Sequence, residues 1–203
     1  MGTRQRRDHE AEQRRQSILR AAKDVFWKAG YAAATIPRVA AAAQLAPGTL
    51  YLYFPGKAAL YAELLAEGYE MLHQRLADSA APDLTPRRRV GALIDAFIEF
   101  AKENPEYFDI MFFVLQREGS DRKGRLDAAQ VRRLKDLENR CHAVAGQVLR
   151  RSGLDHARTG QAALDALWSM LAGVIFYFRN DPTFDAVAKQ ARRLLLSAIF
   201  GGD

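Results

Sequence analysis

The chain contains 203 residues, of which 49% are hydrophobic, so it can form one large or two small domains with a substantial core. Its formal net charge of +6 lies in residues 1–57, which carry ten basic and four acidic side chains, whereas the other 146 residues carry twenty of each. No apolar run reaches the roughly 18–20 residues of a membrane span, and the start lacks a secretory signal. The one cysteine, Cys141, cannot form an internal disulfide. We therefore expect a cytoplasmic protein without a membrane partner.

Helical periodicity dominates the sequence. The chain is rich in Ala, Leu, Arg and Glu, and it shows no sustained alternation of apolar and polar residues. Proline and glycine mostly separate the periodic segments. These features predict an all-α fold of about nine helices. We place the helices at roughly residues 10–29, 36–43, 47–53, 57–79, 86–103, 105–116, 123–152, 157–180 and 183–200.

The first two segments predict the start of a compact three-helix unit. Gly30 is expected to cap the first helix at its C-terminus, and Thr35 is expected to cap the second helix at its N-terminus. The three residues Gln44-Leu45-Ala46 then have the length of a helix-turn-helix turn. The apolar stripe of the first helix is formed by Ile18, Leu19, Ala22, Val25 and Phe26.

A short third helix over 47–53 has the features of a DNA-reading element. Leu50, with Leu45, can fill the space between the second and third helices. An α-helix fits the major groove, and Gly48 lets the helix start approach a base edge. Hydroxyl groups and the ammonium of Lys57, at the start of the next helix, can bind phosphates. The positions left to face outward are Pro47, Gly48, Thr49, Leu52 and Tyr53.

The positive charge of residues 1–57 agrees with a polyanionic partner such as DNA. A solubilising basic tail is the alternative that charge alone leaves open. For Phe54 we expect simple packing against the following helix, and packing is also the alternative for Tyr51 and Tyr53.

The run 35–60, TIPRVAAAAQLAPGTLYLYFPGKAAL, resembles the N-terminal domain of the TetR family of bacterial transcriptional repressors. The resemblance implies that Thr35, Thr49, Tyr53 and Lys57 contact phosphates. It implies that Pro47, Gly48 and Leu52 face the groove and that Tyr51 is a contact or a support between helices. The matching residues agree in order and spacing over about 45 positions; they are Ile18, Ala21, Ala22, Phe26, Gly30, Tyr31, Thr35, Ile36, Ala40, Ala43, Gly48, Thr49, Leu50, Tyr51, Tyr53, Phe54, Lys57 and Leu60.

Two positions depart from the family pattern. Gln44 stands where the family usually has glycine in the turn, and a left-handed backbone there would carry strain. Ala46 stands where the family often has a capping serine, whose loss typically costs about 1 kcal/mol. Both departures concern the rigidity of the turn and leave the expected DNA face unchanged.

The neutral remainder of the chain contains an unusually aromatic segment over 93–116, interrupted at Asn104-Pro105. Such a stripe can be simple core, but sites in helical bundles also lie between helices and are mostly apolar. The family resemblance implies an inducer pocket here, for an apolar or amphipathic ligand. Its expected wall is Phe97, Phe100, Tyr107, Phe108, Met111, Phe112, Leu137, Cys141, Trp168, Leu171 and Ile175, and its possible polar contacts are Tyr107, Asn104, Asn139 and His142.

The last two predicted helices carry apolar residues on more than one side, so each must bury a second face. The resemblance implies a homodimer in which these helices pair with those of a second subunit. Burial within one chain is the alternative. A two-fold dimer would place two reading helices roughly 34–36 Å apart, which predicts a palindromic operator.

An enzyme is the competing class of function. None of the four histidines lies at metal-ligand spacing from a carboxylate or cysteine, and the sequence contains no glycine-rich phosphate loop or nucleophile elbow. We therefore predict no catalysis, no metal and no cofactor.

The sequence predicts a DNA-binding domain over 1–57 and an effector-binding and dimerisation domain over 58–203, in a repressor that an effector releases. The alternative is an architectural or activating DNA-binding protein without an effector.

Overall fold

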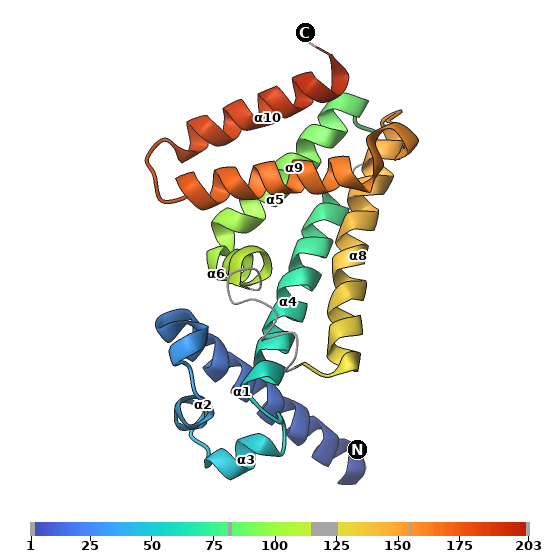
Figure 1. Cartoon of the computed structure of the whole chain (residues 1–203). Helices are drawn as coiled ribbons and strands as arrows, with labels where there is room; N and C mark the ends of the chain where they lie inside the picture. Colours follow the sequence, from blue (N-terminus) through green and yellow to red (C-terminus); the bar gives the residue numbers. More distant parts are fainter. Residues whose placement is uncertain (1–2, 81–82, 115–125, 155, 202–203) are drawn as a thin grey trace. The chain divides into compact units, whose positions relative to one another are not determined.

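The computed structural model describes the backbone of residues 3–80, 83–114, 126–154 and 156–201 (Figure 1). Within these ranges it contains nine α-helices, one π-helix and no strand, which confirms the all-α prediction. These residues divide into two compact units. The N-terminal unit contains residues up to 67 together with 126–132, and the C-terminal unit contains 68–114 and residues from 133 onward. None of the described helices is long and apolar enough to cross a membrane.

Helix α1 (Thr3–Ala33) starts seven residues before the predicted start at residue 10. Its first turns are helical although their side chains are exposed. Side-chain pairs four residues apart stabilise these turns. The buried stripe begins only at Ile18 and continues through Leu19, Ala22 and Phe26, as predicted, with Val25 half-buried. The pairs are Arg6 with Glu10 at 3.0 Å, His9 with Gln13 at 2.8 Å, and Glu12 with Gln16 at 2.7 Å.

Gly30 interrupts α1 with a φ of 71° and a ψ of 166°. The sequence predicts a glycine cap at this residue, and the position is correct, but the ψ value differs from that of a left-handed cap. This region of backbone space is open almost only to glycine. A helical turn resumes over 31–33, and the N–H of Ala34 donates to the carbonyl oxygen of Gly30 at 3.1 Å.

Helices α2 (Ile36–Ala42) and α3 (Pro47–Tyr51) form the helix-turn-helix. The Oγ1 of Thr35 accepts a hydrogen bond from the N–H of Arg38 at 3.4 Å, which confirms the predicted cap of α2. Helix α3 ends two residues before the predicted limit. Leu50 is fully buried, and Leu45 is half-buried.

The turn between α2 and α3 has the two features that its sequence predicts. Gln44 has a φ of 56°, in the left-handed region that disfavours a residue with a side chain. Ala46 precedes α3 without a side-chain hydrogen bond to the helix. The turn is closed instead through the backbone, where the N–H of Leu45 donates to the carbonyl oxygen of Ala40 at 2.8 Å.

Helix α4 (Lys57–Asp78) contains the boundary between the two units. The predicted segment 105–116 is a short α-helix followed by a π-helix, and its residues 115 and 116 lie outside the described residues, as do 123–125 of the next predicted helix. Asn104 separates α5 from α6, as predicted. The other helices are α5 (Pro86–Glu103), α6 (Pro105–Asp109), the π-helix η1 (Ile110–Val114), α8 (Ala128–Arg151), α9 (His156–Phe178) and α10 (Phe184–Phe200).

Two buried glycines allow close packing within the C-terminal unit. A Cβ atom at Gly68 of α4 would lie 2.9 Å from the Sδ of Met111 in η1. A Cβ atom at Gly91 of α5 would clash with the guanidinium of Arg192 in α10, whose Nε donates to Asp95 at 2.6 Å. Glycine lets these side chains pack directly on the helix backbone, and a Cβ atom at either position would displace the flexible end of Met111 or Arg192.

We expect Gly30→Ala to lower the free energy of unfolding by about 1–3 kcal/mol, because alanine is strained at this φ and ψ. Chemical denaturation followed by circular dichroism measures the change. Gly48→Ala is the matched control, since Gly48 is helical and a Cβ atom there would meet no atom within 4 Å, so its stability should be unchanged or raised. Equal stability of the two variants would contradict the strain at Gly30.

Candidate nucleic-acid interface and ligand pocket

The exposed face of α3 is the candidate nucleic-acid interface in the N-terminal unit. Pro47 and Gly48 are exposed at the start of the helix, and a Cβ atom at Gly48 would meet nothing within 4 Å. At its end, Tyr51 is 53% exposed and Leu52 is 82% exposed. The fold therefore presents these four expected contact residues to solvent and does not itself require glycine at Gly48.

The remaining expected contacts are less exposed. Thr49 and Tyr53 are half-buried, so part of each side chain packs within the unit. Thr35 is exposed, although its hydroxyl oxygen caps α2. Phe54 is buried, and the guanidinium of Arg15 lies 4.7 Å from the centre of its ring. Phe54 is therefore part of the core, as the sequence predicts.

Lys57 has a structural contact that the sequence analysis missed. Its half-buried Nζ donates to the carbonyl oxygen of Ala34 at 3.0 Å and to that of Ala32 at 3.4 Å. The ammonium therefore stabilises carbonyl groups near the end of α1, where the helix dipole is negative. A phosphate contact by Lys57 would have to use the same ammonium.

Acidic residues of α4 reduce the charge of the N-terminal unit. Glu63 lies 2.9 Å from Arg15, and Glu67 lies 2.6 Å from Lys23. These two acids lie just beyond residue 57, so residues 1–67 carry a net charge of +4 rather than +6. The net charge of residues 1–67 is still positive, which favours binding to the phosphates of DNA.

A pocket of about 610 Å³ lies within the C-terminal unit, between α4, α5, η1, α8 and α9, and is named the aromatic pocket because aromatic rings line part of it. Phe97 is at the centre of the aromatic cluster: its ring centre lies 4.6 Å from that of Trp168 and 5.5 Å from that of Phe112. Phe112 also stacks on Phe108, with the centres 4.7 Å apart. The π-helix η1 supplies Met111 and Phe112, and π-helical turns are frequent at functional sites.

The structure brings some of the predicted pocket residues together and places the others elsewhere. Asn139 lines a neighbouring polar pocket, and the Nδ2 of Asn104 donates to the carbonyl oxygen of Phe100. Predicted residues that line the aromatic pocket are Phe97, Met111, Phe112, Cys141, His142 and Trp168. Predicted residues that are buried but do not line it are Phe100, Tyr107, Phe108, Leu137, Leu171 and Ile175.

Helix α4 and the later turns of α9 contribute pocket residues that were not predicted from the sequence. Tyr69, Leu72 and Leu76 follow one face of α4 at helical spacing, which was the available signal. In α9 the lining includes small residues between large ones, a pattern that allows space beside a helix. These missed α9 residues are Asp165, Ser169, Ala172, Gly173, Phe176 and Tyr177, and Glu138 of α8 was also missed.

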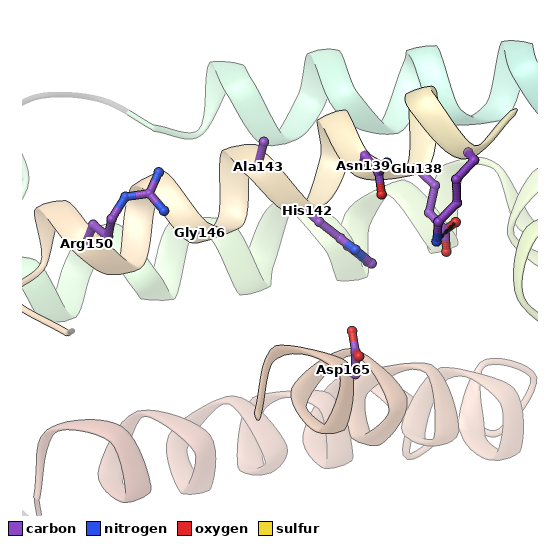
Figure 2. Close-up of a pocket in the computed structure, with 8 residues that line it drawn as sticks. Glu138, Asn139, His142, Ala143, Gly146, Arg150 and Asp165 are labelled. Atoms are coloured by element: carbon purple, nitrogen blue, oxygen red, sulfur yellow. Dashed lines mark hydrogen bonds and ion pairs between the residues drawn. The ribbon is translucent and has the colours of Figure 1, made fainter. Parts of the chain in front are cut away.

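The polar pocket, of about 630 Å³, lies between α8 and α9 (Figure 2). Figure 2 shows the side chain of His142 pointing from α8 toward Asp165 of α9. Glu138, His142 and Asp165 line both pockets, so the polar pocket adjoins one edge of the aromatic pocket. Its other lining residues are Lys135, Asn139, Ala143, Gly146 and Arg150.

Buried polar groups in the aromatic pocket have altered chemistry. Burial raises the pKa of the Cys141 thiol to about 12, and its Sγ donates to the carbonyl oxygen of Tyr69 at 3.5 Å. Burial, with a smaller effect of the negative charge of Glu138, also raises the pKa of the Tyr69 phenol. The indole N–H of Trp168 is buried and has no acceptor among the described residues. A neutral thiol is a poor nucleophile, so this cysteine is not suited to catalysis.

Comparison with known proteins assigns both units. The family model described as "Bacterial regulatory proteins, tetR family" matches residues 18–64, and the one described as "Tetracyclin repressor-like, C-terminal domain" matches residues 90–198. The chain therefore belongs to the TetR family. It is a DNA-binding transcriptional regulator rather than an enzyme.

Individual relatives are distant. The HTH-type transcriptional repressor KstR of Mycobacterium tuberculosis is 32% identical over 93 residues, which cover 46% of this chain and 42% of KstR, so the match spans less than half the length of that relative. The HTH-type transcriptional activator FasR of Mycolicibacterium smegmatis is 26% identical over 178 residues, covering 86% and 76%. The structure of FadR from Bacillus subtilis in complex with stearoyl-CoA has the same fold, with a TM-score of 0.68 at 17% identity, covering 91% and 97%.

We expect alkylation of Cys141 by iodoacetamide at pH 9 to be about five hundredfold slower in the folded protein than in the unfolded chain, because a pKa raised from 9.0 to about 12 lowers the thiolate fraction from about one half to about 0.1%. The raised pKa stabilises the fold below about pH 9, and this stabilisation is lost as the pH rises toward 12. Mass spectrometry follows the reaction at the single cysteine. Equal rates with and without denaturant would contradict the burial of the thiol.

Proposed function

We propose that this regulator is a ligand-responsive repressor that binds a palindromic operator as a homodimer and is released by a small apolar or amphipathic effector. The observation that carries DNA recognition is the exposed face of α3. Leu52 is 82% exposed although the neighbouring Leu50 is fully buried, so α3 has one face in the core and one apolar face in solvent. Such a face fits contact with a DNA groove.

The roles of the individual side chains follow from their chemistry. Gly48 allows the helix start to approach base edges, and Leu52 can contact a thymine methyl group, with Pro47 beside them. The hydroxyls of Thr35, Thr49 and Tyr53 and the ammonium of Lys57 are suited to phosphates, and Tyr51 to a phosphate or a neighbouring helix. Phosphate contacts of this kind make binding depend strongly on salt concentration.

The homodimer would form through α9 and α10. These helices leave Met170, Tyr177 and Leu194 exposed by 54%, 77% and 59%, and all three line one apolar groove. A second copy of the same face would cover these side chains in a two-fold arrangement. Two reading helices about one DNA turn apart then call for a palindromic operator.

The effector would bind in the aromatic pocket, where Trp168 has a buried N–H without an acceptor among the described residues. A ligand there contacts Tyr69, Leu72 and Leu76 of α4, the helix that begins at Lys57. Release of DNA requires that the ligand bind more tightly to the state that does not fit the operator. FadR in complex with stearoyl-CoA is an example of this fold with an amphipathic ligand.

An activator is the second candidate, and the activator FasR, which aligns with most of this chain, favours it. Both candidates use the same DNA face and the same effector pocket, and they differ in where the operator lies relative to the promoter. Transcription from the bound promoter in vitro separates them. A purely architectural role is less well supported, because the C-terminal unit contains a pocket of ligand size.

We expect Gly48→Ala to weaken binding to an operator selected from a random duplex library by about tenfold or more, because the added methyl group would occupy the space of a base edge. Fluorescence anisotropy measures the affinity. The thermal midpoint should not fall, because Gly48 is helical and a Cβ atom there meets nothing within 4 Å, so a loss of affinity would not reflect a loss of folding. Unchanged affinity of Gly48→Ala would remove the start of α3 from the interface.

We expect Leu194→Arg to convert the dimer to a monomer, because a charged side chain cannot be buried in an apolar interface without a partner. Sedimentation velocity measures the mass. Val131→Arg in α8 is the control, since Val131 is also exposed but lies outside the α9 and α10 groove. A dimer that survives Leu194→Arg would place the interface elsewhere.

A further inference from the structure

We propose that the second subunit closes the effector pocket, so that effector binding and dimerisation strengthen each other. This inference rests on the proposed dimer and the proposed effector pocket, and it specifies how the two are linked. It is carried by α9, where the aromatic pocket and the apolar groove of α9 and α10 share three lining residues. Helix α10 packs along α9, and both helices form the groove (Figure 1).

Three neighbouring rows of residues divide this part of α9 between the two sites. The residues of each row are four positions apart, so they lie on the same face of the helix. Among the described residues of α9, the first row lines the pocket but not the groove, and the third row lines the groove but not the pocket. These two outer rows are Trp168, Ala172 and Phe176, and Met170, Val174 and Phe178.

The middle row, which contains Ser169, Gly173 and Tyr177, lines both sites. Ser169 and Tyr177 are exposed, and a Cβ atom at Gly173 would meet nothing within 4 Å. In contrast, Trp168 and Ala172 of the first row are buried. In a single chain the aromatic pocket is therefore open to solvent along the middle row, and at Gly173 only the helix backbone lies between the pocket and the groove.

A second copy of the chain on the groove covers this opening. The groove is the surface through which the proposed dimer forms, and Tyr177 belongs both to this surface and to the pocket. Two-fold symmetry brings the same apolar face of the second copy against the groove. Each aromatic pocket is then bounded along the middle row by the other subunit.

An apolar effector gains from this closure. In a single chain, the part of the effector that faces the middle row stays in water. In the dimer this part is buried, and the hydrophobic free energy grows with the area removed from water. The effector therefore binds the dimer more tightly than the monomer. Linkage is reciprocal, so each bound effector strengthens the dimer by the same factor. Release of DNA then occurs from an intact dimer.

Sedimentation velocity of the full chain over a dilution series tests this link. The probe is Nile red, an uncharged dye whose fluorescence rises in apolar surroundings. We expect a coupling of about fivefold for each pocket, at the lower end of common couplings because only one side of the pocket is open. Each dimer has two pockets, so saturating Nile red should lower the dimer dissociation constant about twenty-fivefold. Leu194→Ala, which trims the groove, brings a very tight dimer into the measurable range.

Leu194→Arg tests the same link from the side of the dye. The monomer that this variant forms should bind Nile red about fivefold more weakly than the unaltered protein, although Leu194 lines the groove and not the aromatic pocket. Fluorescence titration measures the affinity. Val131→Arg in α8 is the matched control, because it adds the same charge at an exposed apolar residue outside both sites, and its affinity for the dye should be unchanged.

Ala172→Leu locates the dye, because Ala172 lines the pocket and not the groove. The added atoms should occupy part of the pocket, so that dye binding weakens and the effect of the dye on the dimer is lost. The dimer dissociation constant without dye should be unchanged, and circular dichroism checks that the variant is folded. Unchanged dye binding by folded Ala172→Leu would place the dye outside the pocket and overturn the inference.

The outcomes separate this inference from the proposed function. A dimer dissociation constant that Nile red leaves unchanged, or raises, would overturn the link and leave the pocket and the dimer in place. A chain that is monomeric at every concentration would overturn the inference together with the proposed dimer. No binding of the dye by a protein that still binds its operator would overturn the inference together with the proposed effector pocket.

Discussion

The burial of Leu50 is the constraint on which the proposed DNA-reading face depends. Helix α3 has five residues and no side-chain cap at Ala46, so it is too short to be stable by itself. It persists because Leu50 is fully buried and Phe54, just beyond its end, is buried beneath Arg15. Burying that side of the helix necessarily turns Gly48 and Leu52 outward. The reading face is thus defined by what the helix packs against, not by its own sequence propensity.

Charge has a larger structural role in the N-terminal unit than its net value suggests. Arg15 and Lys23 pair with acids of α4, and Lys57 donates to carbonyl groups near the end of α1. Partly exposed pairs contribute only about 0–1 kcal/mol each, so their main effect is to fix where the side chains point. The basic groups that remain exposed are the ones available to DNA.

Close helix packing and a ligand-sized space coexist in the C-terminal unit. Gly68 brings α4 against Met111 in η1, and Gly91 brings α5 against Arg192 in α10. Phe97, Phe112 and Trp168 line the remaining space together with the small residues Ser169, Ala172 and Gly173 of α9. Small side chains in this wall occupy less volume than large ones would, which is compatible with a space beside α9.

Features that depend on local backbone chemistry could be predicted from the sequence. Thr35 caps α2, Gly30 breaks α1 and Asn104 separates α5 from α6, each close to where the pattern predicts it. The left-handed conformation of Gln44 was expected from the glycine that the TetR family usually has there. Local pairs also explain why α1 extends beyond its predicted start, although that signal is weaker than an apolar stripe. The family resemblance over 35–60 added the identity of the DNA-binding unit, which the family comparison confirmed.

Which of the buried residues line the pocket could not be predicted without the packing of the helices. Phe100 and Phe108 share the apolar pattern of Phe97, yet the first two pack into the core and the third lines the pocket. An apolar stripe reveals that a side chain is buried, but not whether its neighbour is another side chain or a space. That distinction depends on how helices distant in sequence, here α4, α5, α8 and α9, cross one another, and no local pattern encodes the crossing.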